Sequence, residues 1–234
     1  MKPLGIGHRG ASAYAPENTI AAFNRAFDMG ADGIELDVEL TKDGVPVVFH
    51  FSTPNHPTHG IRSLSAMTLA EVKHLDAGAW FDEKFRSERI PTLTEVLDAV
   101  GSRGKIVVEI KWSAVKLGNA ALEQATAQVI QQSANAHQVI ISSFHPIALY
   151  RIARLAPHIP RALIYQEDLF PWLLNGFWFR WLTRPQQIHP AHAMLTPQLR
   201  PLPRNCTPSG TAISPNTRQA KGWEKRLCIS SRYW

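Results

Sequence analysis

The sequence predicts an α/β fold in which helices surround a parallel sheet closed into a barrel. Apolar, strand-like runs alternate with amphipathic, helix-like segments from residue 4 to residue 165, which is the pattern of successive βα units. Polar residues recur at the carboxyl ends of several of these strands, where the active sites of βα barrels are built. A chain of 234 residues is long enough for one such domain.

The first unit is a short strand followed by a helix. Residues 4–8 read LGIGH and predict a strand, and residues 15–30 read APENTIAAFNRAFDMG and predict a helix. Asn18 is the predicted N-cap, because a short polar side chain can accept a hydrogen bond from the free N–H groups of the first turn. Gly30 stands where a glycine commonly follows the end of a helix.

Two further strands are predicted at about residues 33–38 and 45–50. Two capping boxes come next, each a threonine followed three residues later by a glutamate that starts a helix: Thr68 with Glu71 and Thr92 with Glu95. Gly101 ends the second of these helices. The remaining predicted elements are strands at 105–111, 138–144 and 162–165 and helices at 119–136 and 146–155.

The alternation stops near residue 196, and no strand is predicted beyond it. Residues 1–179 hold 16 Lys/Arg against 18 Asp/Glu, whereas residues 180–234 hold 9 Lys/Arg and one acid, so the net charge of +6 comes from the tail. We predict a barrel domain over residues 1–199 and an atypical, basic, proline-rich tail over residues 200–234. The tail has no basic helix and no interleaved stacking aromatics, so we expect no nucleic-acid partner.

Two further observations bear on location. The chain has only Cys206 and Cys228 and begins without the apolar core of a secretion signal, so we expect a cytoplasmic protein. Its most apolar stretch, residues 169–182, is interrupted by proline, glycine and arginine and is shorter than the roughly 20 residues of a membrane span. We therefore expect no integral membrane segment. The sequence does not indicate an oligomeric state.

Acidic residues at strand ends form the candidate site. Glu35 and Asp37 lie two residues apart on one predicted strand, so their side chains share a face, and Glu109 and Lys111 do the same on another. Buried carboxylates without a positive partner would be strongly destabilising. Such oxygen ligands suit Mg²⁺ or Ca²⁺ rather than zinc, so the sequence predicts a divalent cation between them.

His50 can reach these acids by either of two routes. If Asp43 and Gly44 formed a two-residue hairpin turn, Asp37 would lie opposite His50. If residues 39–44 instead crossed outside a parallel sheet, His50 would end the neighbouring strand. The sequence does not choose between the routes, and both bring His50 near the acids.

Two histidines beside a metal suggest acid and base catalysis on a phosphate ester. His8 and His50 can each take and give a proton near neutral pH. Arg9 and Lys111 would offset the negative charge of a diester that is bound beside three acids. Each of these residues taken alone is more simply explained as a surface, capping or ion-pair residue. Their joint occurrence favours a site.

Several motifs together resemble the glycerophosphodiester phosphodiesterase family, especially its short cytosolic bacterial members. They are HRGASAYAPENT at 8–19 and GADGIELDVELTKDGVPVVFH at 30–50, followed by LDAGAWF, ERIPTLTEVL, VVEIK and ISSF. The resemblance covers residues 1 to about 165. It implies a TIM-type (β/α)8 barrel with a small insertion at about residues 51–90. It also implies hydrolysis of small-molecule glycerophosphodiesters to sn-glycerol 3-phosphate and an alcohol, in glycerophospholipid and glycerol metabolism.

The resemblance also assigns roles by motif. His8 and His50 become the catalytic acid and base, with their order left open. Arg9 and Lys111 become the phosphate contacts. The implied ligands of the divalent cation, Mg²⁺ or Ca²⁺, are Glu35, Asp37 and Glu109.

The chain departs from the family pattern at three places. Phe51 replaces the aspartate that usually follows the second histidine, and losses of this kind weaken metal sites by about 10- to 100-fold. His145 stands where the family often has Asp or Asn. The family's late W-T-V-N and G-V-D segments are absent, so the C-terminal closing strands of the barrel are missing or altered.

The altered C-terminus leaves several alternatives open. A disordered tail, or a reading frame shifted near residues 199–205, would account for the missing segments. The chain could then be a catalytically impaired remnant of the family. A third alternative is an anion-binding protein that acts through its tail.

Overall fold

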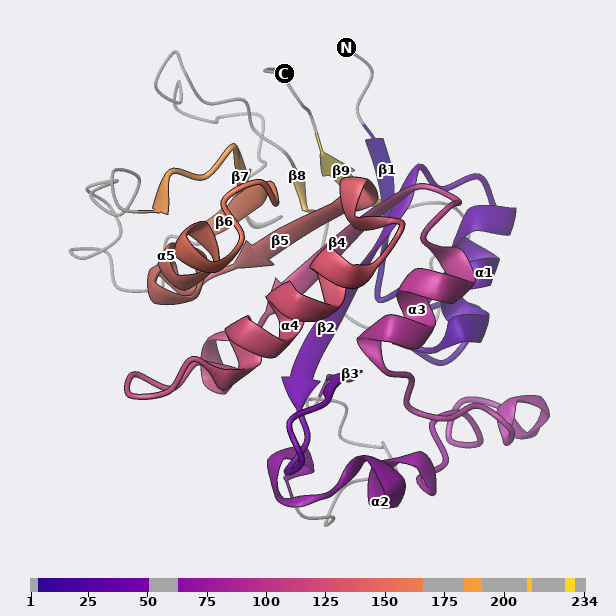
Figure 1. Ribbon diagram of the computed structural model, residues 1–234. Coiled ribbons are helices and arrows are strands. Elements are labelled where there is room, and N and C mark those ends of the chain that lie inside the picture. The colour runs from indigo at the N-terminus through magenta and orange to yellow at the C-terminus, as the bar shows by residue number, and fades with distance from the viewer. Residues whose placement is uncertain (1–3, 51–62, 166–182, 191–209, 212–225, 230–234) are drawn as a thin grey trace.

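A nine-stranded sheet forms the centre of the computed structural model, which describes residues 4–50, 63–165, 183–190, 210–211 and 226–229 (Figure 1). Its hydrogen-bonded order is β7-β6-β5-β4-β2-β1-β9-β8, and β3 pairs with β2 outside this path. The parallel strands are β1 (Leu4–His8), β2 (Gly33–Leu40), β4 (Lys105–Ile110), β5 (Val139–Ser143), β6 (Arg161–Tyr165) and β7 (Gln187–Pro190).

The other strands run antiparallel to their neighbours: β3 (Pro46–Val48), β8 (Gly210–Thr211) and β9 (Arg226–Ile229). The helices are α1 (Ile20–Asp28), α2 (Leu69–Lys73), α3 (Leu93–Val100), α4 (Ala121–Gln132) and α5 (Pro146–Leu155). Among the described residues no strand pairing joins β7 to β8. The sheet is therefore a parallel half-barrel, and the prediction of a barrel with altered closing strands is confirmed.

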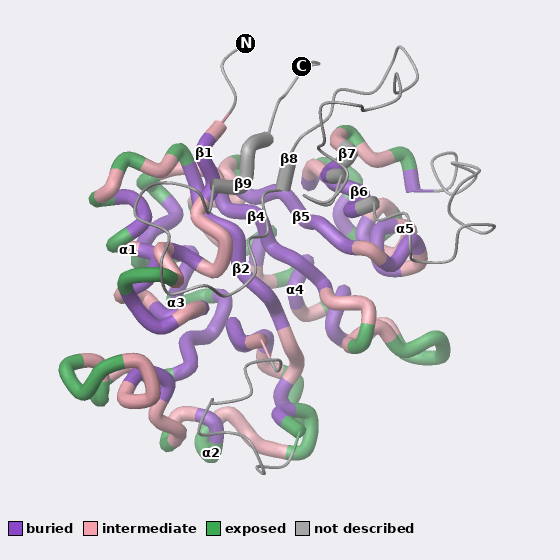
Figure 2. The backbone as a smooth tube through the Cα atoms, turned by 180° about the vertical axis from the view of Figure 1, so that it is seen from behind, coloured by how far each residue is buried: buried purple, intermediate pink, exposed green. Residues whose placement is uncertain are grey.

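The two faces of the sheet have different neighbours, because successive side chains of a strand point to opposite sides. Ile34, Leu36 and Val38 of β2 are fully buried in the main core, which they share with α1, α3, α4 and α5 (Figure 1). The opposite face holds a small cluster of Ile6 and Val107 and, further along the strands, the acidic residues. Burial along β2, β4 and β5 is nearly continuous, as expected for central parallel strands (Figure 2).

Most predicted helix boundaries are confirmed, with one correction. Both capping boxes form, and Gly30 follows α1 with φ +80°. The predicted N-cap Asn18 is wrong, because the Thr19 side chain accepts the hydrogen bond from Ala22 N at 3.2 Å. Asn18 turns instead toward β2, with φ +58°.

The strands β2 and β3 form a hairpin. Its register differs by one residue from the register that the predicted two-residue turn would give. Val38 pairs with Val48, and Phe49 N donates to Asp37 O at 3.0 Å, so Asp37 lies opposite Phe49 rather than His50. The loop has three residues, 42–44, and Gly44 has φ +81°, as in a hairpin with a glycine bulge. The alternative of a parallel crossover is also wrong. His50 therefore lies just past the hairpin pairing.

Residues 63–90 pack a second, smaller core beneath this hairpin. Leu64, Val72 and Ile90 are buried together with Val47 and Phe49. This part of the chain corresponds to the predicted insertion at about residues 51–90, of which 51–62 lie outside the described residues.

Two predictions concern strands and segments late in the chain. The expectation of no strand beyond about residue 196 is wrong, because β8 and β9 lie there and β9 pairs with β1. The apolar stretch at 169–182 and most of the tail at 200–234 lie outside the described residues. In the part of the chain that is described, no helix is both long and apolar enough to cross a bilayer.

Candidate active site

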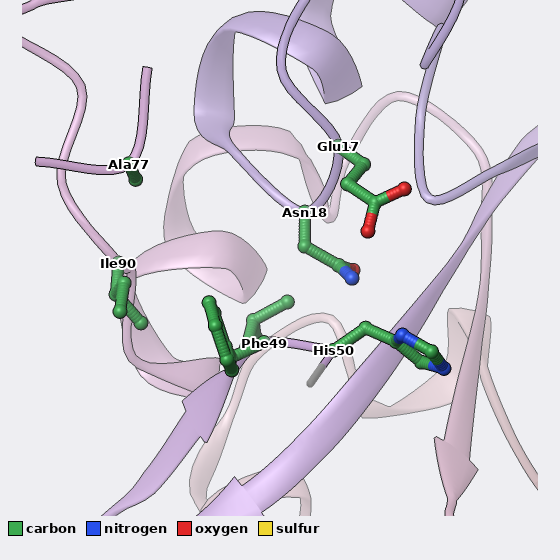
Figure 3. Close-up of a pocket in the computed structure, with 7 residues that line it drawn as sticks. Glu17, Asn18, Phe49, His50, Ala77 and Ile90 are labelled. Atoms are coloured by element: carbon green, nitrogen blue, oxygen red, sulfur yellow. The ribbon is translucent and has the colours of Figure 1, made fainter. Parts of the chain in front are cut away.

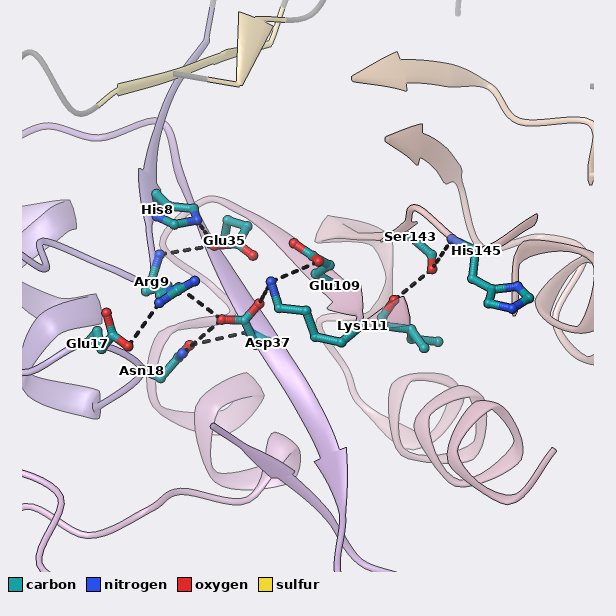
Figure 4. A network of polar contacts seen from close by, with 11 residues as sticks. His8, Arg9, Glu17, Asn18, Glu35, Asp37, Glu109, Lys111, Ser143 and His145 are labelled. Carbon is teal, nitrogen blue, oxygen red and sulfur yellow. Dashed lines mark hydrogen bonds and ion pairs between the residues drawn. The ribbon is translucent and has the colours of Figure 1, made fainter. Parts of the chain in front are cut away.

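Three neighbouring strands bring the predicted acids together on one face of the sheet. In the register of β1, β2 and β4, His8 pairs with Glu35 and Asp37 pairs with Glu109. Carboxylate oxygens of Glu35, Asp37 and Glu109 lie within 4.8 Å of one another, and all three residues are buried (Figure 4). The alternation of side chains along β2 puts Glu35 and Asp37 on one face, and the register of β2 with β4 brings Glu109 beside them.

Two basic side chains lie against this cluster, which we call the acidic triad. The ammonium of Lys111 lies 2.8 Å from Asp37 Oδ1 and 2.9 Å from Glu109 Oε1. Arg9 Nε lies 3.1 Å from Asp37 Oδ2, and the backbone N–H of Arg9 donates to Glu35 Oε2 at 3.0 Å. Part of the positive charge expected between the acids therefore comes from the protein itself (Figure 4).

Lys111 and Arg9 do not stabilise the ionised forms of the three acids equally. Burial alone would raise the pKa of Asp37, but Lys111 and Arg9 outweigh it and hold that pKa below its usual range. Burial, followed by the charges of Asp37 and Glu109, raises the pKa of Glu35 well above normal. Burial also raises the pKa of Glu109, against the attraction of Lys111. Glu35 Oε1 is buried and has no hydrogen-bond partner among the described residues.

Both predicted catalytic histidines border the triad. His8 Nε2 lies 3.7 Å from Glu35 Oε2. Burial and the charge of Arg9 lower the pKa of His8 to about 3. Burial, opposed by Asp37 and assisted by Arg9, lowers the pKa of His50 to about 4. Both imidazoles are therefore neutral at pH 7 and able to accept a proton.

Two further residues of the site, Glu17 and Asn18, were not predicted to take part. Asn18 Nδ2 donates to Asp37 Oδ2 at 3.0 Å, and Asp37 N donates to Asn18 Oδ1 at 3.3 Å. Glu17 accepts a hydrogen bond from Arg9 at 3.0 Å. Arg9 and Asn18 both have positive φ, which is uncommon outside glycine and clusters at functional sites. The signal in the sequence was the motif PENT, which predicted a helix cap and the likeness to the family but no contact with the acids.

A small hollow lies beside Asn18 and His50 (Figure 3). It has room for about one water molecule. It lies between the loop before α1, the end of β3 and the insertion, and its lining residues are Glu17, Asn18, Val48, Phe49, His50, Ala77 and Ile90. Its size excludes it as the cavity for a whole diester substrate.

The end of β4 that carries Lys111 is fixed from β5. Ser143 Oγ donates to the carbonyl of Ile110 at 2.6 Å and accepts from His145 N at 2.9 Å (Figure 4). His145 caps α5, since its Nδ1 accepts from Ile147 N at 3.2 Å, and its ring stacks on Trp112 at a centroid distance of 4.2 Å. A histidine here thus performs the capping task for which Asp or Asn is more usual.

Comparisons with known proteins agree with this geometry. A model of the glycerophosphoryl diester phosphodiesterase family matches residues 8–173. A glycerophosphodiester phosphodiesterase of Caldanaerobacter subterraneus subsp. tengcongensis is 41% identical over 229 residues, which cover 97% of this chain and 90% of that protein. Another, from Bacillus subtilis, is 36% identical over 168 residues, or 67% of this chain and 57% of that protein.

Solved structures are similar as well. A phosphodiesterase of Oleispira antarctica, in complex with the product sn-glycerol-3-phosphate, has a TM-score of 0.71 at 28% identity and covers 83% of this chain and 77% of its own. A glycerophosphodiester phosphodiesterase from Agrobacterium tumefaciens has a TM-score of 0.67 at 28% identity, with 83% and 79% covered.

Proposed function

Because the chain belongs to the glycerophosphoryl diester phosphodiesterase family, we propose that it hydrolyses glycerophosphodiesters to sn-glycerol 3-phosphate and an alcohol with the help of a divalent cation. The observation that carries this proposal is the buried acidic triad on β2 and β4, bordered by two histidines and two basic residues. The product named for the Oleispira antarctica relative supports this substrate class.

The charges around the triad fit a divalent cation. Three carboxylates, those of Glu17, Asp37 and Glu109, share two cationic side chains, Arg9 and Lys111, and Glu35 makes no ion pair with either side chain. Carboxyl groups therefore outnumber basic side chains here, and one Mg²⁺ or Ca²⁺ would offset the excess negative charge. Glu35 is the clearest candidate ligand, because its pKa is raised and its Oε1 accepts no hydrogen bond from the described residues, and Asp37 and Glu109 complete an all-oxygen set. When bound, the cation would stabilise the negative charge on a phosphoryl oxygen.

Arg9 and Lys111 are the proposed phosphate contacts. Both side chains are partly buried against Asp37, which fixes their positions without the substrate. A guanidinium presents two donors in one plane and matches phosphate oxygens, whereas an ammonium acts as a point charge. Together they would hold the diester beside the triad, where an isolated anion would be repelled.

His8 and His50 are the proposed acid and base. Hydrolysis adds one water across the bond between phosphorus and the leaving oxygen: one imidazole takes the proton that the attacking oxygen loses, and the other gives a proton to the oxygen of the alcohol that leaves. Both are neutral in the free protein because burial lowers both pKa values. Binding of the anionic diester would raise these pKa values and so favour the protonated form of the donor.

The proposal extends to the setting of the enzyme. We infer a small-molecule substrate from glycerophospholipid and glycerol metabolism and a cytoplasmic location, which the use of only two cysteines supports. The proposed catalytic domain spans residues 1–199, followed by the basic tail at 200–234.

Hydrolysis of glycerophosphocholine by the purified full chain tests the proposal. We expect release of sn-glycerol 3-phosphate with Mg²⁺ or Ca²⁺, and none after removal of the cation by a chelator. His8→Ala, His50→Ala and Glu35→Gln should each abolish turnover. His158→Ala, at an exposed histidine before the amino end of β6, is the matched control and should leave it unchanged. Turnover that survives the chelator and all three site variants would contradict the proposal.

A further inference from the structure

One row of side chains continues the acidic triad across the sheet. The register pairs Asp37 of β2 with Glu109 of β4, Glu109 with Ser142 of β5, and Ser142 with Ala162 of β6. Residues paired in a parallel sheet point to the same side, so Ser142 shares the face of the triad. Adjacent strands lie about 5 Å apart, which makes Ser142 the immediate neighbour of Glu109 on the side away from Asp37.

The hydroxyl group of Ser142 has no hydrogen-bond partner in the part of the chain that the structure describes. Its side chain is 1% exposed, and Oγ makes no hydrogen bond among the described residues. Buried hydroxyl groups are nearly always paired, because leaving one unpaired is unfavourable, so an exception requires an explanation. The adjacent Ser143 follows the rule, since its hydroxyl both donates to Ile110 O and accepts from His145 N. Of the two buried hydroxyl groups without a partner among the described residues, that of Thr126 lies on α4, whereas that of Ser142 lies on the sheet face that carries the triad.

On the basis of the proposed function, we propose that the Ser142 hydroxyl binds a hydroxyl group of the glycerol part of the substrate. The proposed phosphate position is beside Lys111 and Asp37, and Ser142 lies one strand beyond Glu109 and two beyond Asp37, so the three-carbon chain attached to that phosphate would extend past Glu109 toward Ser142. A serine hydroxyl can both donate and accept, as an alcohol does.

Other ligands fit this position less well. A divalent cation would be drawn to the carboxylates of the triad, which offer charged oxygens against one neutral hydroxyl. The phosphate would be drawn to the guanidinium and ammonium groups on the other side of Glu109. A polar but uncharged group is what remains for Ser142. A site built to bind a substrate hydroxyl discriminates against analogues that lack it, so Ser142 would favour glycerol esters over simple alkyl esters.

The test compares two ligands that share a phosphate and differ in the glycerol hydroxyl groups. Calorimetric titration of the full chain in Mg²⁺ measures the affinity for sn-glycerol 3-phosphate and for ethyl phosphate. We expect Ser142→Ala to weaken binding of sn-glycerol 3-phosphate by about three- to tenfold, the effect of one hydrogen bond, and to leave ethyl phosphate unchanged. Ser143→Ala is the matched control, which should lower the melting temperature and keep the ratio of the two affinities.

Thermal unfolding without ligand separates binding from a structural role. Removing an unpaired hydroxyl should leave the melting temperature of Ser142→Ala equal to or above that of the wild type. A fall of several degrees, or an equal loss of affinity for both ligands, would overturn the proposal. So would a wild type that binds the two ligands equally, or a variant whose preference is unchanged.

Hydrolysis of glycerophosphocholine, measured on the same preparations, decides the proposed function separately. Turnover by the wild type together with an unchanged ligand preference in Ser142→Ala would remove the role of Ser142 and keep the enzyme. If the wild type shows no turnover, but prefers sn-glycerol 3-phosphate and loses this preference in Ser142→Ala, the glycerol contact stands and the proposed hydrolase activity does not.

Discussion

Glu35 illustrates how a residue can lower the stability of the protein while fitting it for binding. Burial and two neighbouring carboxylates raise its pKa, so its ionised form is unfavourable in the absence of a cation. We expect Glu35→Gln to raise the free energy of unfolding in a chelator by about 1 kcal/mol, because an amide oxygen can still accept the hydrogen bond from Arg9 N. Urea unfolding in the chelator measures this change.

The same variant should lose its response to the cation. Mg²⁺ or Ca²⁺ should raise the melting temperature of the wild type, since a ligand that binds only the folded state stabilises it, and should leave that of Glu35→Gln unchanged. Asp98→Asn, at an exposed acid on α3, is the control and should respond like the wild type. A less stable Glu35→Gln, or an equal response in both proteins, would contradict this account.

Asn18 combines a strained backbone with two hydrogen bonds to Asp37. We expect Asn18→Gly and Asn18→Ala to lower kcat/KM equally, because both release Asp37. The free energy of unfolding should also be about 1 kcal/mol lower in Asn18→Ala than in Asn18→Gly, since glycine adopts φ +58° without strain and alanine does not. Initial rates and urea unfolding measure the two effects. Equal stability of the two variants, or an unchanged rate in the glycine variant, would show that Asn18 does not work in this way.

His189 makes stability depend on pH. Burial lowers its pKa to about 4, from a normal value near 6.5. Between these values the unfolded chain binds a proton that the folded chain does not, so the contribution is present at pH 7 and is lost as pH falls from about 6.5 toward 4. Between pH 7 and pH 5, the wild type should lose free energy of unfolding through His189, and His189→Gln should not. The loss over this interval should therefore be about 2 kcal/mol smaller in His189→Gln. Denaturation at the two pH values checks it, and parallel losses in both proteins would refute it.

At the scale of elements, Arg151 joins α5 to α4 and to the loop after β4. Its guanidinium donates to Glu123 at 2.8 Å and to the carbonyl groups of Lys116, Leu117 and Asn119. Glu123 is almost fully buried, so loss of its partner leaves an unpaired buried charge. We expect Arg151→Lys to lower the free energy of unfolding by about 2 to 4 kcal/mol, because an ammonium group cannot contact all four acceptors that the guanidinium contacts. Arg154→Lys, one turn further along α5, should be nearly neutral in the same urea titration. If Arg151→Lys leaves the free energy of unfolding unchanged, the contacts of Arg151 contribute little to stability.

Elements whose boundaries depend on neighbouring residues could be predicted from the sequence. The capping boxes at Thr68 and Thr92 and the glycine at Gly30 act within one turn of a helix, so a local pattern specifies them. Asn18 carries the same local signal as a cap, but Asp37 lies across the site and takes its side chain. In the hairpin, Gly44 adopts positive φ and adds a third loop residue, which shifts the register by one. These two errors arise because a tertiary contact or a backbone conformation decided between locally similar choices.

At the scale of the molecule, the sequence predicts those parts of the site that depend only on the alternation of side chains along one strand. Residues two apart on a strand share a face, which places Glu35 with Asp37 and Glu109 with Lys111. The position of Lys111 between Asp37 and Glu109, and that of Ser142 beside Glu109, depend on which strands are neighbours and in what register. That information is held by the packing of the whole sheet. The pairing of β9 with β1 was missed for the same reason, since neither strand carries a local sign of its partner.

A strand from the tail, β9, pairs with β1 and makes it an inner strand of the sheet. Leu4, Gly5, Ile6 and Gly7 pair with the four residues of β9, and β1 ends at His8 beside the triad. The match to the Caldanaerobacter subterraneus relative covers 97% of this chain and so reaches into residues 200–234. We expect deletion of residues 210–234 to expose the backbone of β1 as an open edge, and therefore to lower the melting temperature, reduce turnover and promote aggregation.

Deletion of residues 230–234 alone keeps β9 and is the matched control. Light scattering, thermal unfolding and the glycerophosphocholine assay compare the two shortened chains with the full one. If the chain that ends at residue 209 stays monodisperse, stable and active, the basic tail lies outside the catalytic fold, as its composition predicts. If that chain aggregates while the control does not, the strand at Arg226–Ile229 completes the sheet that holds His8, since an unpaired β1 edge is the difference between them.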